Sequence, residues 1–345
     1  LASDLALLQG RHMALAKRIA VTLPAGPRIE DTIARIQWAE EQGIADAWFS
    51  DSGAPDTLTQ VAAIAHLTKN VRIGTAVTPV YTRSPSVLAA SANVIGQLLP
   101  DRFVMGLGSS SQTIMGQFNG IPLDKPLTRV RETAELVKTM LTGEKTDFDG
   151  ETLFSKGYRQ APMENPPPIY LAALRPKMIE MAAEVGDGVI FNLWPKAALP
   201  KMMEHVAIGA EKVGKNPADV EIVNRAMVLC TDDKEYGRTL FRAAFGPYYA
   251  TPVYNNFLAW AGYEDAAAQI TEGWAAKDRA KTASAMSDEM IDEIAIIGNE
   301  EEIQRRIQED ADGGVHTHII APLAASREDT ERTFAAFTAQ AFQFS

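Results

Sequence analysis

Residues 71–108 read VRIGTAVTPVYTRSPSVLAASANVIGQLLPDRFVMGLG, and this stretch decides the fold. An apolar run at 71–78 is closed by a proline, and a second apolar run follows at 103–107, as expected of two buried strands. Between them, Ser84-Pro85 places a proline at the first position of a helix, where its missing N–H is tolerated. Continuous apolar strands separated by a helix are typical of a parallel sheet that is covered on its outside.

The same unit of strand and helix repeats along the chain. We predict eight short strands, at residues 19–23, 47–50, 71–78, 103–107, 169–173, 189–193, 220–230 and 317–321. Eight such units are the number that closes a (β/α)8 barrel, the α/β fold also called the TIM barrel. An open, doubly wound sheet is the alternative. Its dinucleotide fingerprint is incomplete here, because Ser111 stands where the third glycine belongs.

Two insertions interrupt the repeat. The first, at about 143–168, contains the turn signal Asp-Gly at 149–150 and is expected to form a hairpin. The second, at about 232–298, is mostly helical by pattern and is expected to break at Gly-Pro 246–247, at Pro252 and at Gly262. We expect both insertions on the face where the carboxyl ends of the strands lie, with the second acting as a lid.

The start of the chain differs from the rest. The pair His-Met at 12–13 is typical of a cloning junction, so residues 1–12 are expected to be a tag or an N-terminal arm. We then expect one domain over residues 13–345. No secretory signal is visible and the chain has one cysteine, which together favour a cytoplasmic protein.

Composition and charge exclude several classes of partner. Of the 345 residues, 46% are hydrophobic and 22% are charged, which is typical of a globular protein. The formal net charge of −11 at pH 7 repels nucleic-acid phosphates over most of the surface, so we expect no nucleic-acid partner. No apolar run approaches the ~18 residues that cross a bilayer, so we expect no membrane partner.

Residues with metal-binding chemistry are few. Cys230 is flanked by apolar residues and is expected to be a buried thiol. His316 and His318 could share one face of a strand, but the sequence offers no further ligand nearby. We therefore expect core or surface histidines and no metal.

The chain also lacks the short motifs of several enzyme classes. It contains no Gly-x-Ser-x-Gly elbow, no phosphate-binding P-loop and no His-Glu-x-x-His zinc motif, so hydrolase and metalloprotease chemistry has no support. In a barrel, catalytic residues occupy the loops at the carboxyl ends of the strands. The loops expected to line one cavity, together with the second insertion, are residues 50–53, 75–84, 108–112, 174–176 and 192–195.

Three groups of side chains fall on these loops. Asp51 follows the second strand, as a candidate catalytic carboxylate or simply a helix cap. The small and hydroxyl-bearing run at 106–111 lets a planar or phosphorylated ligand approach the backbone, although a serine-rich turn is the simpler alternative. The insertion's aromatic residues form either a lid over a ligand or the insertion's own core; they include Tyr248, Tyr254, Phe257 and Trp260.

Longer motifs resemble those of the luciferase-like flavin and deazaflavin oxidoreductases. The runs GTAVTPVYTRSP at 74–85 and DRFVMGLG at 101–108 are similar to the third-strand and fourth-strand motifs of that family. IPLDKPLTRVRE at 121–132, YLAALRPKM at 170–178 and GDG at 186–188 continue the pattern. The resemblance runs collinearly to the C-terminus and is strongest with the coenzyme F420-dependent branch, near methylenetetrahydromethanopterin reductase.

This resemblance implies a barrel that holds the cofactor ring in its mouth. It implies a non-proline cis peptide at 76–77, in a bulge of the third strand that backs the ring. Residues 173–176 map near the cofactor phosphate, where a helix N-terminus and Arg175 suit an anion, although Arg175 replaces the family's usual glycine. The implied cofactor contacts are Ser50, Asp51, Thr75, Ala76, Val77, Gly108, Ser109, Ser110, Ser111, Ala173, Leu174, Arg175, Pro176 and Asn192.

Departures from the family pattern narrow the chemistry. The family's alcohol and sugar-phosphate dehydrogenases have a histidine where this chain has Ser52 and a glutamate near Ser111, so those two activities are disfavoured. We expect hydride transfer between coenzyme F420 and a small organic substrate. Asp51 and Tyr81 are the candidate catalytic residues, with Tyr81 or water as the proton source. An electron-poor acceptor needs little acid assistance, because the hydride donor does most of the chemistry.

Two other functions stay open. An FMN-dependent monooxygenase of the same fold would use a reduced flavin and oxygen, and a non-catalytic cofactor-binding protein would need no acid or base. The candidate substrate contacts favour an apolar or planar substrate; they are Tyr248, Tyr254, Phe257 and Trp260. Members of the family often form homodimers, so the resemblance implies a homodimer.

Overall fold

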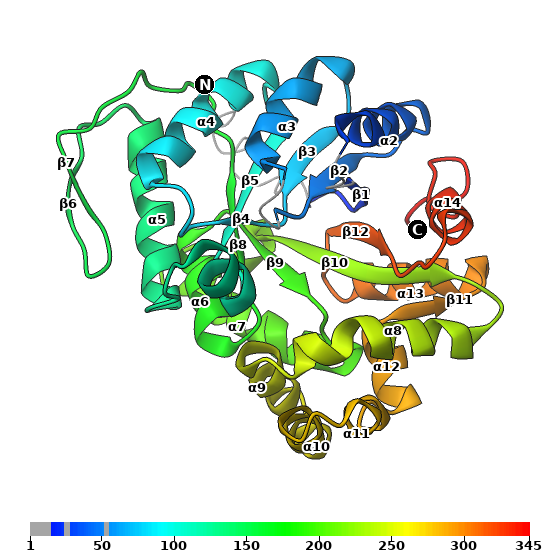
Figure 1. Cartoon of the computed structure of the whole chain (residues 1–345). Helices are drawn as coiled ribbons and strands as arrows, with labels where there is room; N and C mark the ends of the chain where they lie inside the picture. The colour runs from blue at the N-terminus through cyan, green and yellow to red at the C-terminus, as the bar shows by residue number, and fades with distance from the viewer. Residues whose placement is uncertain (1–14, 24–27, 52–54) are drawn as a thin grey trace, which may run out of the picture.

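Eight parallel strands close into a barrel in the computed structural model, which describes residues 15–23, 28–51 and 55–345 (Figure 1). In order around the barrel they are β1 (Arg18–Leu23), β2 (Asp46–Phe49), β3 (Arg72–Thr75), β5 (Phe103–Gly108), β8 (Ile169–Ala172), β9 (Gly188–Asn192), β10 (Glu221–Cys230) and β12 (Thr317–Pro322). The ring closes because β12 pairs with both β1 and β10, and β9 pairs with β10. The predicted (β/α)8 barrel is confirmed, and the open sheet is wrong. The expected tag or arm at residues 1–12 lies outside the described residues.

Two short strands modify this ring. β4 (Thr78–Pro79) takes over from β3 beside β5, so the strand predicted at 71–78 is split in two. β11 (Ile296–Gly298) pairs with the last residues of β10. The sequence analysis did not predict β11, because three residues are too few to show a hydrophobic period.

Helices surround the barrel on its outside (Figure 1). They are α2 (Ile29–Glu41), α3 (Thr57–Ile64), α4 (Pro85–Leu98), α5 (Pro126–Leu141), α6 (Pro176–Val185), α7 (Leu199–Glu211), α13 (Glu300–Asp312) and α14 (Arg327–Ala335), with the short helices η1 (Ala65–Leu67), η2 (Thr113–Phe118), η3 (Lys196–Ala198) and η4 (Pro217–Asp219). Local signals set their starts: the Ser84 hydroxyl accepts from the Val87 N–H, and α13 begins with a full capping box. Within the described part of the chain, no helix has the length and apolar character to cross a bilayer.

The two insertions have the predicted secondary structure. The first forms an antiparallel hairpin of β6 (Asp147–Asp149) and β7 (Phe154–Lys156), which projects from the barrel (Figure 1). The second contains α8 (Lys234–Tyr249), α9 (Pro252–Trp260), α10 (Glu264–Ala275), α11 (Arg279–Ser284) and α12 (Asp288–Ile294). The break expected at 246–247 is wrong, because Pro247 lies inside α8. The buried side chains of Phe241, Phe245 and Tyr249 hold this helix in place on both sides of the proline.

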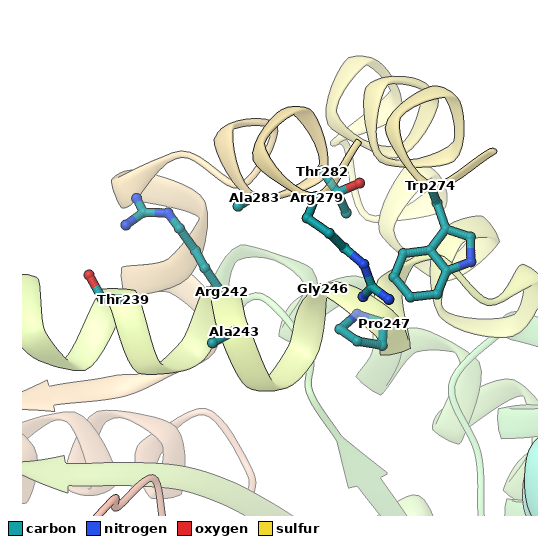
Figure 2. Close-up of a pocket in the computed structure, with 9 residues that line it drawn as sticks. All are labelled: Thr239, Arg242, Ala243, Gly246, Pro247, Trp274, Arg279, Thr282 and Ala283. Carbon is teal, nitrogen blue, oxygen red and sulfur yellow. The ribbon is translucent and has the colours of Figure 1, made fainter. Parts of the chain in front are cut away.

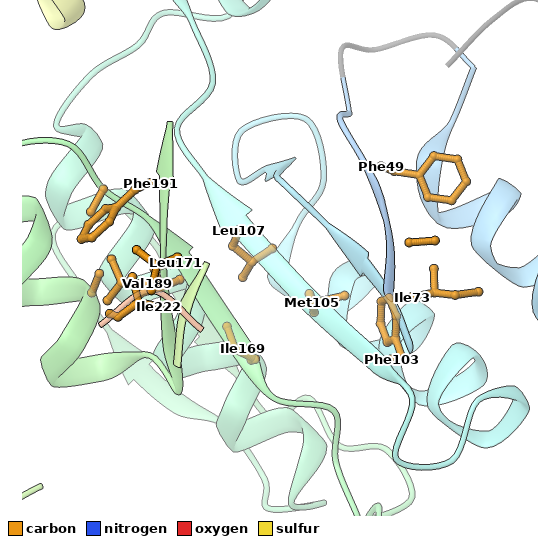
Figure 3. Close-up of a cluster of buried hydrophobic side chains, with 14 of the residues drawn as sticks. Phe49, Ile73, Phe103, Met105, Leu107, Ile169, Leu171, Val189, Phe191 and Ile222 are labelled. Atoms are coloured by element: carbon orange, nitrogen blue, oxygen red, sulfur yellow. The ribbon is translucent and has the colours of Figure 1, made fainter. Parts of the chain in front are cut away.

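Strand alternation divides the core into two layers. Outward-facing strand residues pack under the helices, as Leu107, Leu171 and Phe191 do in Figure 3. A smaller cluster fills the barrel interior, made of Ala20, Trp48, Val104, Tyr170, Ile190, Val223 and Ile319. Gly74 makes room for the Trp48 indole, since a Cβ there would lie 2.5 Å from the ring.

A network of buried charges closes the amino end of this interior. The Arg72 guanidinium lies 2.6 Å from both the Asp46 and the Glu221 carboxylates. The hydroxyls of Tyr170 and Thr317 each donate to Glu221 at 2.6 Å. Burial by itself would raise the pKa of Glu221, but the hydrogen bonds and charge of Arg72 lower it to about 2. The network joins β2, β3, β8, β10 and β12 across the barrel.

Replacing the central cation tests this network. We expect Arg72→Met to lower the free energy of unfolding by about 3–5 kcal/mol, because two buried carboxylates lose their main partner. Urea denaturation at pH 7 measures this loss. Arg305→Met, which removes an exposed arginine of α13, is the control and should change stability by less than about 1 kcal/mol.

Acid titration gives a second readout of the same variant. Since the folded-state pKa of Glu221 lies near 2, below its ordinary 4.5, its stabilisation is complete above pH 4.5 and is lost as the pH falls towards 2. The Arg72→Met protein should lose less stability across that window than the native protein. An equal loss in both proteins contradicts the assignment.

Candidate functional site

At the carboxyl end of the barrel, small side chains cover the interior cluster next to the third strand. Ala76 and Val77 lie half-buried on the interior cluster, and the peptide bond between them is cis, as the resemblance implied. They are here called the floor of the barrel mouth, the carboxyl end of the barrel that the loops after the strands border. A floor of backbone and small side chains suits contact with a flat ligand face.

The floor is built where the third strand is interrupted. β3 pairs with β5 up to Gly74, and β4 resumes pairing at Thr78. Between these points, the Thr75 hydroxyl donates to the Gly106 carbonyl at 2.8 Å and accepts from the Gly106 N–H at 2.9 Å. A Cβ on Gly106 would lie 1.7 Å from the Thr75 carbonyl oxygen, so only glycine fits. The fully buried Thr75 side chain therefore replaces the missing strand pairing.

The serine loop after β5 borders this floor. A Cβ on Gly108 would lie 2.6 Å from the Val77 side chain, so the loop approaches the floor closely. Ser110 adopts a left-handed conformation with φ of 63°, and the Ser111 hydroxyl accepts from the Ile114 N–H at 3.2 Å, just ahead of η2. Ser109 and Ser110 are part-exposed. The loop is therefore both the simple serine-rich turn and a wall of the mouth.

Residues 173–176 lie beside the serine loop, because β8 pairs with β5. Ala173 is buried and its N–H donates to Ile190 at 3.1 Å, while Leu174 is part-buried. Arg175 is exposed and immediately precedes α6, whose first residue is Pro176. The positive end of the helix dipole and the exposed guanidinium form a positive rim.

The predicted carboxylate Asp51 is buried and paired with an arginine that the sequence analysis missed. The Arg83 guanidinium lies 3.0 Å from Asp51 and 2.7 Å from Asp56. Burial opposes the charge of Arg83, but these two carboxylates raise its pKa. Asp51 and the neighbouring part-buried Ser50 thus stand at the edge of the mouth, with Asp51 held as an ion-pair partner. Arg83 belongs to the run at 74–85 that carries the resemblance, and this was the signal that could have found it.

The Tyr81 side chain also has partners within the protein. Its hydroxyl donates to the Asp124 carbonyl at 2.5 Å, and the Arg129 guanidinium lies 5.5 Å from its ring centre. Burial raises the pKa of Tyr81 above its usual range. Its proton is therefore held by the protein backbone in this structure.

On the opposite side of the barrel, Asn192 ends β9. Its side-chain N–H donates to the Tyr254 hydroxyl at 2.8 Å, which joins the barrel to α9. The Asn192 side-chain oxygen is buried and has no hydrogen-bond partner among the described residues. Arg225 is its direct neighbour on β10 and was not predicted from the sequence.

The four aromatic residues predicted to bind substrate are not brought together. Tyr254 reaches the mouth through Asn192, and the exposed Tyr248 packs edge-on against it at 5.8 Å. Phe257 is fully buried and stacks on Trp260 at 5.9 Å, and Trp260 lies under the Lys201 ammonium of α7. The second pair therefore contacts the outer helix layer, while the first pair faces the mouth.

Two further cavities lie elsewhere. One of about 330 Å³ is lined by the insertion helices α8, α10 and α11, with the Arg279 guanidinium 4.4 Å from the centre of Trp274 (Figure 2). The other, of about 370 Å³, lies between α4 and residues 161–165. Neither is lined by a predicted site residue.

The histidines and the cysteine take the expected positions. His318 is fully buried, and burial lowers its pKa to about 3, so it is neutral. His316 accepts a hydrogen bond from the Ile222 N–H at 3.0 Å, and Cys230 is a buried thiol. In the part of the chain that the structure describes, no group of three or more candidate ligands could hold a metal ion.

Comparison with known proteins assigns the family. Residues 11–317 match the family described as luciferase-like monooxygenase. The chain belongs to this family. It is thus an enzyme of the oxidoreductase class, and the predicted resemblance is confirmed.

Relatives and solved structures agree with this assignment. The chain is 29% identical to 5,10-methylenetetrahydromethanopterin reductase of Methanolobus tindarius, over 84% of this chain and 90% of that one. It is 32% identical to F420-dependent glucose-6-phosphate dehydrogenase of Mycolicibacterium gilvum, over 57% and 64%. The fold resembles the coenzyme F420-dependent tetrahydromethanopterin reductase of Methanopyrus kandleri, with a TM-score of 0.78, 18% identity and coverage of 94% and 98%.

The Thr75 bridge gives a direct test of the floor. Thr75→Val keeps the shape but leaves the N–H and carbonyl of Gly106 unpaired, so we expect a loss of about 1–3 kcal/mol in the free energy of unfolding. Thr75→Ser keeps the hydroxyl and should lose clearly less. Denaturant unfolding of both proteins measures the difference, and equal losses would show that the hydroxyl bonds do not matter.

Proposed function

We propose that this protein is an F420-dependent oxidoreductase that transfers a hydride between coenzyme F420 and a small organic substrate. The observation that carries the proposal is the floor of two small residues, Ala76 and Val77, at the barrel mouth, in a chain related in sequence to an enzyme named for F420. When bound, reduced F420 supplies a hydride to an activated C=C, C=N or carbonyl group.

The residues of the mouth fit such a cofactor. The floor and Gly108 provide a surface without large side chains, so a broad planar ring fits against the backbone. The part-exposed Ser109 and Ser110 provide hydroxyls beside that surface. The positive rim at Arg175 and the N-terminus of α6 suits a phosphate group. The remaining proposed contacts are Ser50, Asp51, Thr75, Ser111, Ala173, Leu174, Pro176 and Asn192.

Other side chains at the mouth are proposed to hold the loops, contact the substrate and supply a proton. The ion pair of Asp51 and Arg83 fixes the loop after β2 against the loop after β4. Tyr254 and Tyr248 offer aromatic faces and hydroxyls to a substrate on the side of the insertion. Because the Tyr81 hydroxyl donates its proton to the Asp124 carbonyl, water is the proposed proton source. Tyr81 is the second candidate proton donor. We also propose a cytoplasmic homodimer without nucleic-acid partners.

Binding and turnover test the proposal. We expect the protein to bind F420 more tightly than FMN in titrations followed by cofactor fluorescence, and to oxidise reduced F420 with at least one acceptor of a broad panel. Tight FMN binding without F420 binding overturns the proposal in favour of the FMN-dependent monooxygenase. F420 binding without turnover on any acceptor overturns it in favour of a non-catalytic binding protein.

The rim arginine should contribute to cofactor affinity. We expect Arg175→Gln to raise the Kd for F420 about tenfold, the effect of losing roughly one charge-assisted hydrogen bond. Arg327→Gln removes an arginine that is 93% exposed on α14 and should leave the Kd unchanged. Equal affinity of Arg175→Gln and native protein removes Arg175 from the cofactor site.

A conservative variant separates the two proton sources. With water as the source, Tyr81→Phe should lower kcat less than threefold, because the lost hydroxyl served the Asp124 carbonyl. A positioned general acid contributes about 10²–10⁴-fold, so a loss of that size would identify Tyr81 as the donor. Steady-state rates on whichever acceptor turns over decide between the two.

A further inference from the structure

Arg225 is a cation on the inner face of the barrel. It follows Val223 by two residues, and Val223 belongs to the interior cluster, so both side chains point inward. Its register partners are Asn192 on β9 and Ile319 on β12. Arg225 therefore lies one layer above the packed interior, at the mouth.

This guanidinium has no anionic partner among the described residues. Its Nε is buried without a hydrogen bond to the described residues, and a terminal N–H donates to the Met227 sulfur at 3.8 Å. The ionisable groups that act on it are the hydroxyls of Tyr254 and Tyr248, and burial lowers the pKa of Arg225.

The contrast with the other end of the barrel is informative. Arg72, also on an inner face, has two carboxylates at 2.6 Å. Burying a charge without a partner lowers the stability of the folded protein. A ligand that supplies the opposite charge would offset this cost, and this would explain why Arg225 is present.

The neighbours of Arg225 complete a polar site. The Tyr254 hydroxyl accepts from Asn192, so its own hydrogen is free to be donated. The buried Asn192 oxygen is an unpaired acceptor beside it. The site thus offers a guanidinium and a hydroxyl to an anion, and one acceptor to an adjacent N–H or O–H group.

We propose that Arg225 and Tyr254 bind a planar oxyanion, of carboxylate or enolate type, on a molecule that enters the barrel mouth. This proposal rests on the proposed function for the identity of that molecule. The oxyanion belongs either to the organic substrate or to the cofactor ring, and both sources present the same chemistry to the guanidinium. On the first source, the enzyme's substrates are organic acids.

A matched pair of probes tests the charge. Benzoate and benzamide have the same size and planarity but differ in charge. In titration calorimetry we expect the native protein to bind benzoate at least tenfold more tightly than benzamide. Arg225→Gln should abolish the preference, Arg225→Lys should restore part of it, and the exposed control Arg327→Gln should keep it in full.

Repeating the titration with F420 present separates the two sources. A preference for benzoate that persists with F420 supports a substrate oxyanion. A preference that F420 removes, together with at least tenfold weaker F420 binding by Arg225→Gln, supports an oxyanion of the cofactor. If the native protein prefers benzoate but binds no F420, the oxyanion site stands and the proposed function fails.

Other outcomes overturn the proposal. Equal affinity of the native protein for benzoate and benzamide does so, and so does a preference that survives Arg225→Gln. Thermal unfolding guards against misfolding: Arg225→Met, which removes an unpaired charge, should leave Tm unchanged or higher. A Tm lowered by 5 °C or more would assign Arg225 a structural role instead.

Discussion

The ion-pair network of Arg72 is the interaction on which the interior of this barrel depends. In a closed parallel sheet, every second side chain points into a narrow space that must be filled. Here the amino end is filled by three charges and two hydroxyls that satisfy one another across five strands, and the middle largely by Trp48 and aliphatic side chains. The filling stops at Ala76 and Val77. What is left at the carboxyl end is shaped in part by small residues, and this is where we propose the site.

The same end of the barrel shows how a side chain can substitute for backbone pairing. The Thr75 hydroxyl satisfies both backbone groups of Gly106 where β3 and β5 part, so the strand can leave the ladder without exposing buried polar groups. The floor is thereby held by these hydrogen bonds as well as by the interior cluster on which it packs.

Much of this architecture follows from the sequence. The eight strands were predicted because strands buried on both faces are continuous apolar runs, and the hairpin because Asp-Gly has a defined turn geometry. The helix break predicted at Pro247 was wrong, because the packing of Phe241, Phe245 and Tyr249 outweighs the local effect of the proline. Arg225 was missed because a lone arginine in a mostly apolar strand gives no motif, and its neighbour Asn192 is 33 positions away. Among the insertion's aromatics, sequence spacing could not tell which side of α9 faces the mouth.

The length of β10 has a consequence for how ligands enter. Its first five residues pair with β9, and its last three pair with β11, which is the final element of the second insertion. Both ends of that insertion are therefore fastened to one strand of the barrel wall. It cannot swing outward as a hinged flap without breaking a parallel ladder. A ligand that passes Tyr254 must instead be admitted by small rearrangements among α8 to α11. The two ends of the insertion stay in place while these helices adjust.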